Sequence, residues 1–195
     1  MANIFTKNQT NTSFTPRQLL ENKYKVSRAN LLLVLAFTAI NLILLLINSN
    51  TYFLFSAFIP YFIADLGMLM CGKYPAEFYV DDFAGMEFLD TSFLVVMVVI
   101  AFAVLALYLL AWFLSKNNKV GWLIFALILF GIDTVLMFLL SGISVSSIFD
   151  ILFHAWVIYE LAVGIHAHYK LKALPPEEAP APSDAFDYFG TENQN

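Results

Sequence analysis

Five ionisable side chains lie inside apolar runs long enough to be membrane helices. They are Asp65, Asp133, Asp150, His154 and Glu160. A charged side chain near the centre of a bilayer costs about 2.5–3.5 kcal/mol on insertion scales, so it normally faces protein or water and has a partner. Carboxylates and an imidazole can pass protons or act as acid and base. They can equally hold helices together, and we take that structural role as the first interpretation.

The sharpest hypothesis is a contact between Asp133 and His154. The apolar runs that carry them are joined by a short turn centred on 143–144. In an antiparallel hairpin each residue would lie about ten residues from the turn, or about 15 Å at 1.5 Å per residue, and therefore at equal depth. Asp150 lies one helical turn before His154 and would hold the other ring nitrogen. Gly131 would leave room for the neighbouring helix.

The other two acids have different expected surroundings. Asp65 lies within two turns of the end of its apolar segment, so we interpret it as an acid that reaches the membrane interface. Glu160 lies about 120° around the helix from the candidate histidine, so one small site cannot easily use both. Tyr108, at a similar depth on the preceding hairpin, is the candidate partner of Glu160.

Short motifs of known chemistry are incomplete. Residues 67–73 have the spacing of a phosphate-binding loop, but Tyr74 replaces the serine or threonine that would hold magnesium. His166 and His168 have no third metal ligand nearby. The single cysteine, Cys71, excludes an internal disulfide and a cysteine-based metal cluster. We therefore assign no catalytic residue, no metal and no cofactor.

Composition identifies the elements that carry these residues. Of the 195 residues 60% are apolar and 13% charged, and the mean hydropathy is +0.73. A soluble domain carries about a quarter charged residues. The apolar runs reach the roughly 20 residues that a helix needs to cross a bilayer core, and they lack the alternation of a β-barrel. We predict an all-α, polytopic integral membrane protein. With ten basic residues and no basic face, it is not expected to bind nucleic acid.

Five hydrophobic segments make up a predicted membrane domain at 29–172. Their approximate bounds are 31–47, 52–71, 91–114, 120–140 and 148–169. Short connections favour consecutive antiparallel hairpins. Asp90 is placed to cap the start of the third segment. Pro60 interrupts the second segment, and Asn41 lies at a similar depth, where it can satisfy backbone groups that a kink leaves open.

Polar segments flank this domain. Residues 1–28 form a basic leader with five basic residues and one acid. No small-residue cleavage site follows it, so we expect the first hydrophobic segment to be a retained anchor. Residues 173–195 form an acidic, proline-rich tail that has too few apolar side chains to build a core and is predicted to be disordered.

Charge and length disagree about the number of crossings. Basic residues favour the cytoplasmic side of a membrane. Four crossings, with the first or second segment re-entrant or interfacial, would put nine of the ten basic residues on one side, whereas five crossings split them six to four. The apolar length of 52–71 favours a full span. We give length the greater weight and expect five spanning helices, with four as the alternative.

Three classes of function fit this sequence. The first is an accessory, assembly or regulatory subunit that acts by contacts, because the loops are short and no catalytic motif is complete. The second is a small oligomeric transporter or channel, proton-linked through the ionisable groups of its helices. The third is a membrane-embedded enzyme, although the sequence favours a non-enzymatic role. Expected partners are the lipid bilayer and a second copy or another protein, in a cell membrane such as a bacterial plasma membrane.

Overall fold

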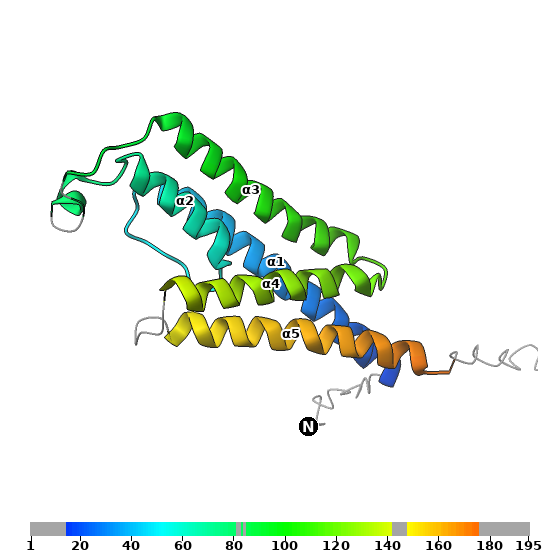
Figure 1. Ribbon diagram of the computed structural model, residues 1–195. Helices are drawn as coiled ribbons and strands as arrows, with labels where there is room; N and C mark the ends of the chain where they lie inside the picture. Colours follow the sequence, from blue (N-terminus) through cyan, green and yellow to red (C-terminus); the bar gives the residue numbers. More distant parts are fainter. Residues whose placement is uncertain (1–14, 81–82, 84, 142–147, 176–195) are drawn as a thin grey trace, which may run out of the picture.

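The computed structural model describes residues 15–80, 83, 85–141 and 148–175. Its elements are α1 (Pro16–Leu46), α2 (Phe58–Met70), the 3-10 helix η1 (Ala76–Tyr79), α3 (Thr91–Leu114), α4 (Val120–Ser141) and α5 (Ile148–Ala173) (Figure 1). These residues contain no strand, and four helices (α1, α3, α4 and α5) are long and apolar enough to cross a membrane. The predicted all-α, polytopic membrane class is therefore confirmed. The start of the leader, the turn after α4 and most of the acidic tail lie outside the described residues.

α1 begins well before the apolar segment expected at 31–47. The Thr15 hydroxyl accepts a hydrogen bond from the Gln18 N–H at 3.2 Å, and the Gln18 side chain accepts one from the Thr15 N–H at 3.0 Å. This reciprocal capping box fixes the helix start, and Pro16 fits the first helical position because no N–H is needed there. The 31 residues of α1 extend about 46 Å, more than a bilayer core, so the first turns carry basic side chains beyond the apolar zone.

The second segment is not the spanning helix that its apolar length led us to expect. Residues 51–57 are non-helical, and α2 has only 13 residues. Pro60 does not kink a helix but lies in the first turn of α2, where a missing N–H costs nothing. The Asn48 side chain donates to the Lys73 carbonyl at 2.9 Å, so α1 and α2 end at the same side. The segment is therefore re-entrant, and α1 and α2 do not form the expected hairpin.

The described residues thus contain four helices that are long and apolar enough to span a membrane, and the start of α1 and the end of α5 meet on one side. Arg17 at the start of α1 donates to the Pro175 carbonyl just after α5 at 2.8 Å. Tyr24 donates to the Ser115 carbonyl in the connection between α3 and α4 at 2.8 Å. We call this side the basic end, because eight basic residues of the described ranges belong to it: Arg17, Lys23, Lys25, Arg28, Lys116, Lys119, Lys170 and Lys172. The opposite side, which carries the acid-rich loop at 71–90, is the acidic end.

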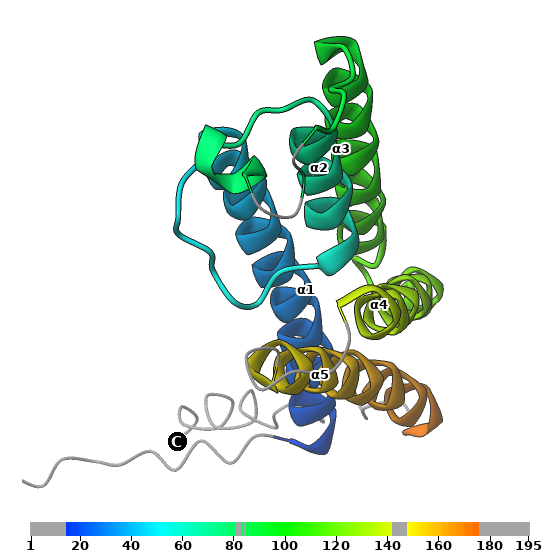
Figure 2. The same cartoon turned by 60° about the vertical axis from the view of Figure 1, so that its left-hand side comes forward.

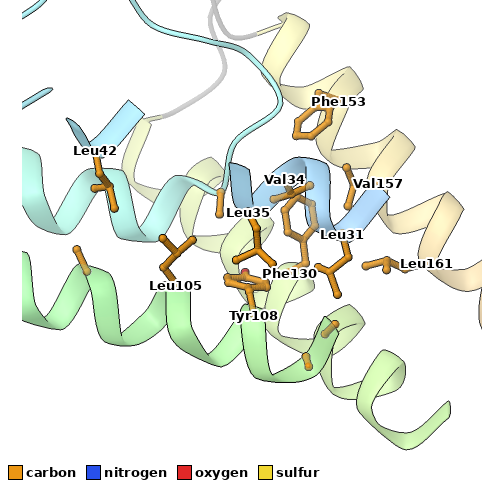
Figure 3. Packing of buried hydrophobic residues seen from close by; sticks show 14 of the residues in the cluster. Leu31, Val34, Leu35, Leu42, Leu105, Tyr108, Phe130, Phe153, Val157 and Leu161 are labelled. Atoms are coloured by element: carbon orange, nitrogen blue, oxygen red, sulfur yellow. The ribbon is translucent and has the colours of Figure 1, made fainter. Parts of the chain in front are cut away.

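The helices form two groups that share one apolar core. Figure 2 shows α1, α2 and α3 running alongside one another while α4 and α5 cross them. Where the groups meet, α1, α3, α4 and α5 contribute the core side chains drawn in Figure 3. α1 packs antiparallel on α5 at Gly164, where an added Cβ would lie 2.4 Å from Ser27. Gly131 does not make room for a neighbouring helix as expected, since no atom lies within 4 Å of its added Cβ.

Candidate functional site

The re-entrant segment has open backbone groups at membrane depth, and side chains of α1 satisfy them. The Asn41 carbonyl oxygen accepts from the Phe53 N–H at 2.8 Å, and its amide donates to the Phe53 carbonyl at 2.7 Å. The same amide donates to the Ser56 hydroxyl at 3.0 Å. Unpaired backbone groups in a bilayer cost several kcal/mol each, so these bonds permit non-helical chain there. The role expected for Asn41 is present, although its main partner is Phe53.

The first turn of α2 takes its hydrogen-bond acceptors from two other helices. A helix begins with four N–H groups that lack an internal partner. The Ala57 N–H donates to the Thr38 hydroxyl at 2.8 Å. The Phe58 N–H donates to Asp133 Oδ2 at 2.9 Å, and the Ile59 N–H donates to Asp133 Oδ1 at 2.7 Å. The fourth residue, Pro60, has no N–H. All four positions are thereby accounted for, with Asp133 of α4 acting as the N-terminal cap of α2.

His154 completes the surroundings of this carboxylate. Its Nε2 lies 3.2 Å from Asp133 Oδ2, so the predicted contact between the two residues is present. Both are buried, Asp133 at 0% exposure and His154 at 2%. The imidazole stacks on Phe130, with ring centroids 4.9 Å apart. Asp150 does hold the other ring nitrogen, but through its backbone carbonyl, 2.8 Å from Nδ1, rather than through its carboxylate as expected.

The groups around His154 constrain which of its ring nitrogens carries hydrogen. A carbonyl oxygen only accepts, so Nδ1 of His154 carries hydrogen. In a neutral ring Nε2 would then be an acceptor, and it would face an acceptor carboxylate at 3.2 Å. An additional proton between Nε2 and Asp133 removes this conflict. Because both carboxylate oxygens also accept backbone N–H groups, the arrangement suits an imidazolium beside a carboxylate.

A small cavity with both polar and apolar side chains in its wall lies against His154 on the side that faces the acidic end. Its volume is about 140 Å³. The lining side chains come from α2, α4, α5 and the non-helical stretch before α2: Tyr52, Phe58, Tyr61, Met137, Ser141, Asp150 and His154. Asp150 therefore belongs to the site by position, as a half-buried carboxylate in the cavity wall. Phenol, hydroxyl, carboxylate and imidazole groups in one cavity can hold water or a small polar ligand.

The other two predicted acids lie elsewhere. Glu160 accepts from the Asn30 amide at 3.2 Å and is not paired with Tyr108. Tyr108 instead packs against Phe130, and its buried hydroxyl has no hydrogen-bond partner among the described residues. Asp65 accepts a short hydrogen bond from the Tyr74 hydroxyl near the acidic end, which fits the interfacial acid we expected. Burial, and then this bond, raise the pKa of Tyr74 far above its ordinary value.

Sequence reasoning missed a second capping site, at the basic end. Arg28 of α1 donates to the Ser115 hydroxyl at 2.8 Å and to the Trp112 carbonyl at 2.9 Å. Its guanidinium also lies 5.6 Å from the centroid of the Trp112 ring. A cation at a helix C-terminus satisfies open carbonyl groups and opposes the helix dipole. The signal in the sequence was a lone arginine entering an apolar run.

The described residues hold no group of three or more His, Cys, Asp or Glu side chains with the geometry of a metal site. His166 is exposed, and His168 packs beside Tyr24, with ring centroids 5.9 Å apart. No protein-family model, curated protein or solved structure matches the chain. The site is thus described by its own residues: a helix that begins inside the bundle, held by Asp133, with His154 and a small cavity behind it.

Proposed function

We propose that this protein acts by contacts, as an accessory, assembly or regulatory subunit in a cell membrane, most simply a bacterial plasma membrane. The observation that carries the proposal is how the polar groups inside the bundle are used. Asp133, Asn41 and Asn30 bind other groups of the same chain and hold the re-entrant segment and the helices in place. These side chains therefore serve to hold the fold together rather than to act on a substrate.

A layer of apolar side chains separates this polar site from the basic end. Its members are at most 1% exposed: Leu31, Val34, Tyr108, Leu123, Phe130 and Leu161. Figure 3 labels all of them except Leu123 and shows their packing between α1, α3, α4 and α5. A transport path through a single copy would need polar groups or water across this layer, and the members of the layer offer only the Tyr108 hydroxyl. This favours contacts over transport.

The surface best suited to a partner is the groove between α1 and α3. It has a volume of about 380 Å³ and is almost wholly apolar. It is lined by Leu32, Leu35, Ala36, Ala39, Phe102, Leu105, Ala106 and Leu109. Small residues let helix backbones approach closely in lipid, where association depends on packing. A transmembrane helix of another protein or of a second copy is the occupant that fits such a groove.

The charge distribution supports an orientation with the basic end in the cytoplasm. Basic residues near membrane helices favour that side, and Lys73 is the one base of the described residues at the acidic end. The loop at 71–90 then faces outward. The start of α1 and the end of α5 then lie at the cytoplasmic side, where a regulatory or assembly partner can reach them.

The proposal is tested by site-specific photo-cross-linking in native membranes. A photoreactive amino acid at Ala106 in the groove is expected to give one discrete adduct, whose mass identifies a second copy or another protein. The same residue at Leu139, which is 73% exposed on α4, is the matched control and should give only lipid adducts. Filling the groove with Ala36→Trp should abolish the adduct. Equal labelling at both positions contradicts the proposal.

Proton-linked transport by an oligomer is the second candidate, and the buried contact between His154 and Asp133 is the observation that favours it. An oligomer would have to supply the path that one copy lacks. Proton flux into vesicles containing the purified protein, lost in Asp133→Asn, would support this candidate against the first. Flux no greater than in protein-free vesicles would remove it.

A further inference from the structure

The cavity beside His154 has a larger neighbour at the acidic end. This outer cavity has a volume of about 510 Å³. Its lining comes from the end of α1, the start of α2 and the loop after α2: Leu45, Asn48, Ser49, Asn50, Tyr61, Tyr74, Pro75, Glu77 and Phe78. Tyr61 lines both cavities. Its ring meets Tyr52 edge-on, with centroids 5.1 Å apart, so one aromatic pair stands between the outer space and His154.

We propose that the two cavities form one water-filled half-channel that is open at the acidic end and closed toward the basic end. Hydronium reaches the Asp133–His154 pair through it from the acidic end only. The polar groups in the two linings support water, since a buried water needs two to four polar partners. The outer cavity offers amide, hydroxyl and carboxylate groups of Asn50, Ser49 and Glu77. The inner cavity offers Tyr52, Ser141 and Asp150. Beyond the pair, Phe130 and Leu161 close the path toward the basic end.

The groups around the pair leave one ionisable carboxylate on the cavity side. The stretch before α2 contributes the Tyr52 phenol, α2 contributes backbone N–H groups and the Tyr61 phenol, and α3 contributes the Tyr108 phenol. From α1 the neighbours are the neutral side chains of Thr38 and Asn41. Asp150 of α5 is the remaining acid. The site therefore takes a proton carried by water, with Asp150 as the carboxylate of the inner cavity and Glu77 as that of the outer cavity.

Protonation here would be coupled to the shape of the protein, because Asp133 also caps α2. Removing the additional proton leaves Nε2 of His154 facing a carboxylate oxygen, two acceptors at 3.2 Å. The carboxylate also binds the Phe58 and Ile59 N–H groups, so a shift of Asp133 moves the start of α2. The half-channel thus gives the re-entrant segment a sensitivity to pH at one membrane face, which goes beyond a contact function.

Cysteine labelling tests the water path. In a Cys71→Ala background, which lacks the only native thiol, cysteines are placed one at a time on α4. Met137→Cys lines the inner cavity, Ala126→Cys is buried on the basic side of Asp133, and Ile132→Cys faces lipid. A small cationic methanethiosulfonate in contact with the acidic end should modify Met137→Cys about tenfold faster than either control, since thiol reactivity follows access and thiolate formation. Equal rates, or modification from the basic end, would overturn the proposal.

Tyr61 and the pair are tested separately. Tyr61→Trp should slow labelling of Met137→Cys while leaving Asn50→Cys in the outer cavity unchanged, and no change at either position would show that the path avoids Tyr61.

Infrared difference spectra of sealed vesicles should show a carboxyl or imidazole band after a pH step at the acidic end only. The band should be absent in Asp133→Asn and in His154→Gln, and a band of equal size from the basic end would refute one-sided access. These readouts are independent of cross-linking in the α1–α3 groove, so either proposal can fail alone.

Discussion

At the scale of single residues, Asp133 combines two structural roles in one carboxylate. It accepts the first two N–H groups of α2 and holds the imidazole of His154. Neither role requires a substrate, and both explain why a carboxylate is retained where insertion is costly. Thr38 has a similar double role, since its hydroxyl accepts from Ala57 and donates to the Val34 carbonyl at 2.7 Å.

Removing the Asp133 carboxylate should therefore unfold the re-entrant segment first. Asp133→Ala leaves the Phe58 and Ile59 N–H groups and Nε2 of the buried His154 ring without their partner, and we expect a loss of about 3–5 kcal/mol. Asp133→Asn keeps one acceptor oxygen and should lose less. Thermal unfolding in detergent measures how much stability each variant loses. Asp65→Asn, near the acidic end, is the control that also removes one carboxylate charge. If Asp133→Ala unfolded at the same temperature as Asp65→Asn, the proposed capping role of Asp133 would be wrong.

Asp90 gives a local pH dependence at the start of α3. Its Oδ1 accepts from the Ser92 N–H at 2.8 Å, and this backbone hydrogen bond lowers the pKa of Asp90 below its ordinary value of 3.8. A depressed pKa means that the cap contributes stability above the unfolded-state pKa and loses it as the pH falls through the folded-state pKa. Amide exchange in the first turn of α3 should accelerate over that acidic range, beyond its intrinsic pH dependence.

Asp90→Asn is the control for this effect, because asparagine caps a helix but does not titrate. Its exchange in the first turn of α3 should follow the intrinsic pH dependence throughout. Identical pH profiles in the two proteins would exclude Asp90 as the titrating cap.

At the scale of elements, close packing between helices depends on particular small residues. Gly67 of α2 lies against α3, since an added Cβ would be 2.9 Å from Met97. Gly164 of α5 lies against α1 at Ser27, and helices in lipid associate by such close approach. α2, with 13 residues, would be marginal as an isolated helix. Its stability comes from α3 beside it and from the side chains that cap it.

Gly164→Ala should separate α1 from α5. The new methyl group would lie 2.4 Å from both Cβ and Oγ of Ser27, and overpacking of this kind costs about 1–3 kcal/mol. Gly131→Ala, with no atom within 4 Å, should be neutral or stabilising because alanine favours helix over glycine. Thermal unfolding of the two variants measures this difference in stability.

A double-mutant cycle identifies the cause of the Gly164→Ala loss. Adding Ser27→Gly restores the space, so the double variant should lose less stability than the sum of the single variants. Additive losses would mean that the clash with Ser27 is not responsible.

At the scale of the whole molecule, the even number of crossings determines where the chain ends lie. Arg17 and Pro175 are in contact, whereas Lys73 and the loop that contains it lie at the other side. Reporter domains fused before residue 15 and after residue 175 should therefore report the same compartment. A reporter inserted near residue 85 should report the opposite one. Opposite compartments for the two ends would require five spans and contradict the fold.

Much of the membrane domain could be predicted from the sequence. The segments expected at 91–114, 120–140 and 148–169 correspond to α3, α4 and α5 within a few residues, because each apolar run is bounded by polar turns and α3 is capped by Asp90. The depth of Asp133 and His154 followed from equal distances to one turn, and this register gave their contact. The helix class, the membrane environment and this pair were determined by local pattern.

The tertiary structure alone decided what the apolar segment at 52–71 does. Hydropathy depends on composition alone. The hydropathy of an apolar segment is therefore the same whether the segment spans as one helix or re-enters as extended chain followed by α2. The choice depends on acceptors and donors for the open backbone, and Thr38, Asn41 and Asp133 supply them from helices distant in sequence. The same dependence on distant residues explains why the carboxylate of Asp133 could be paired with His154 from the sequence, but not recognised as the cap of α2.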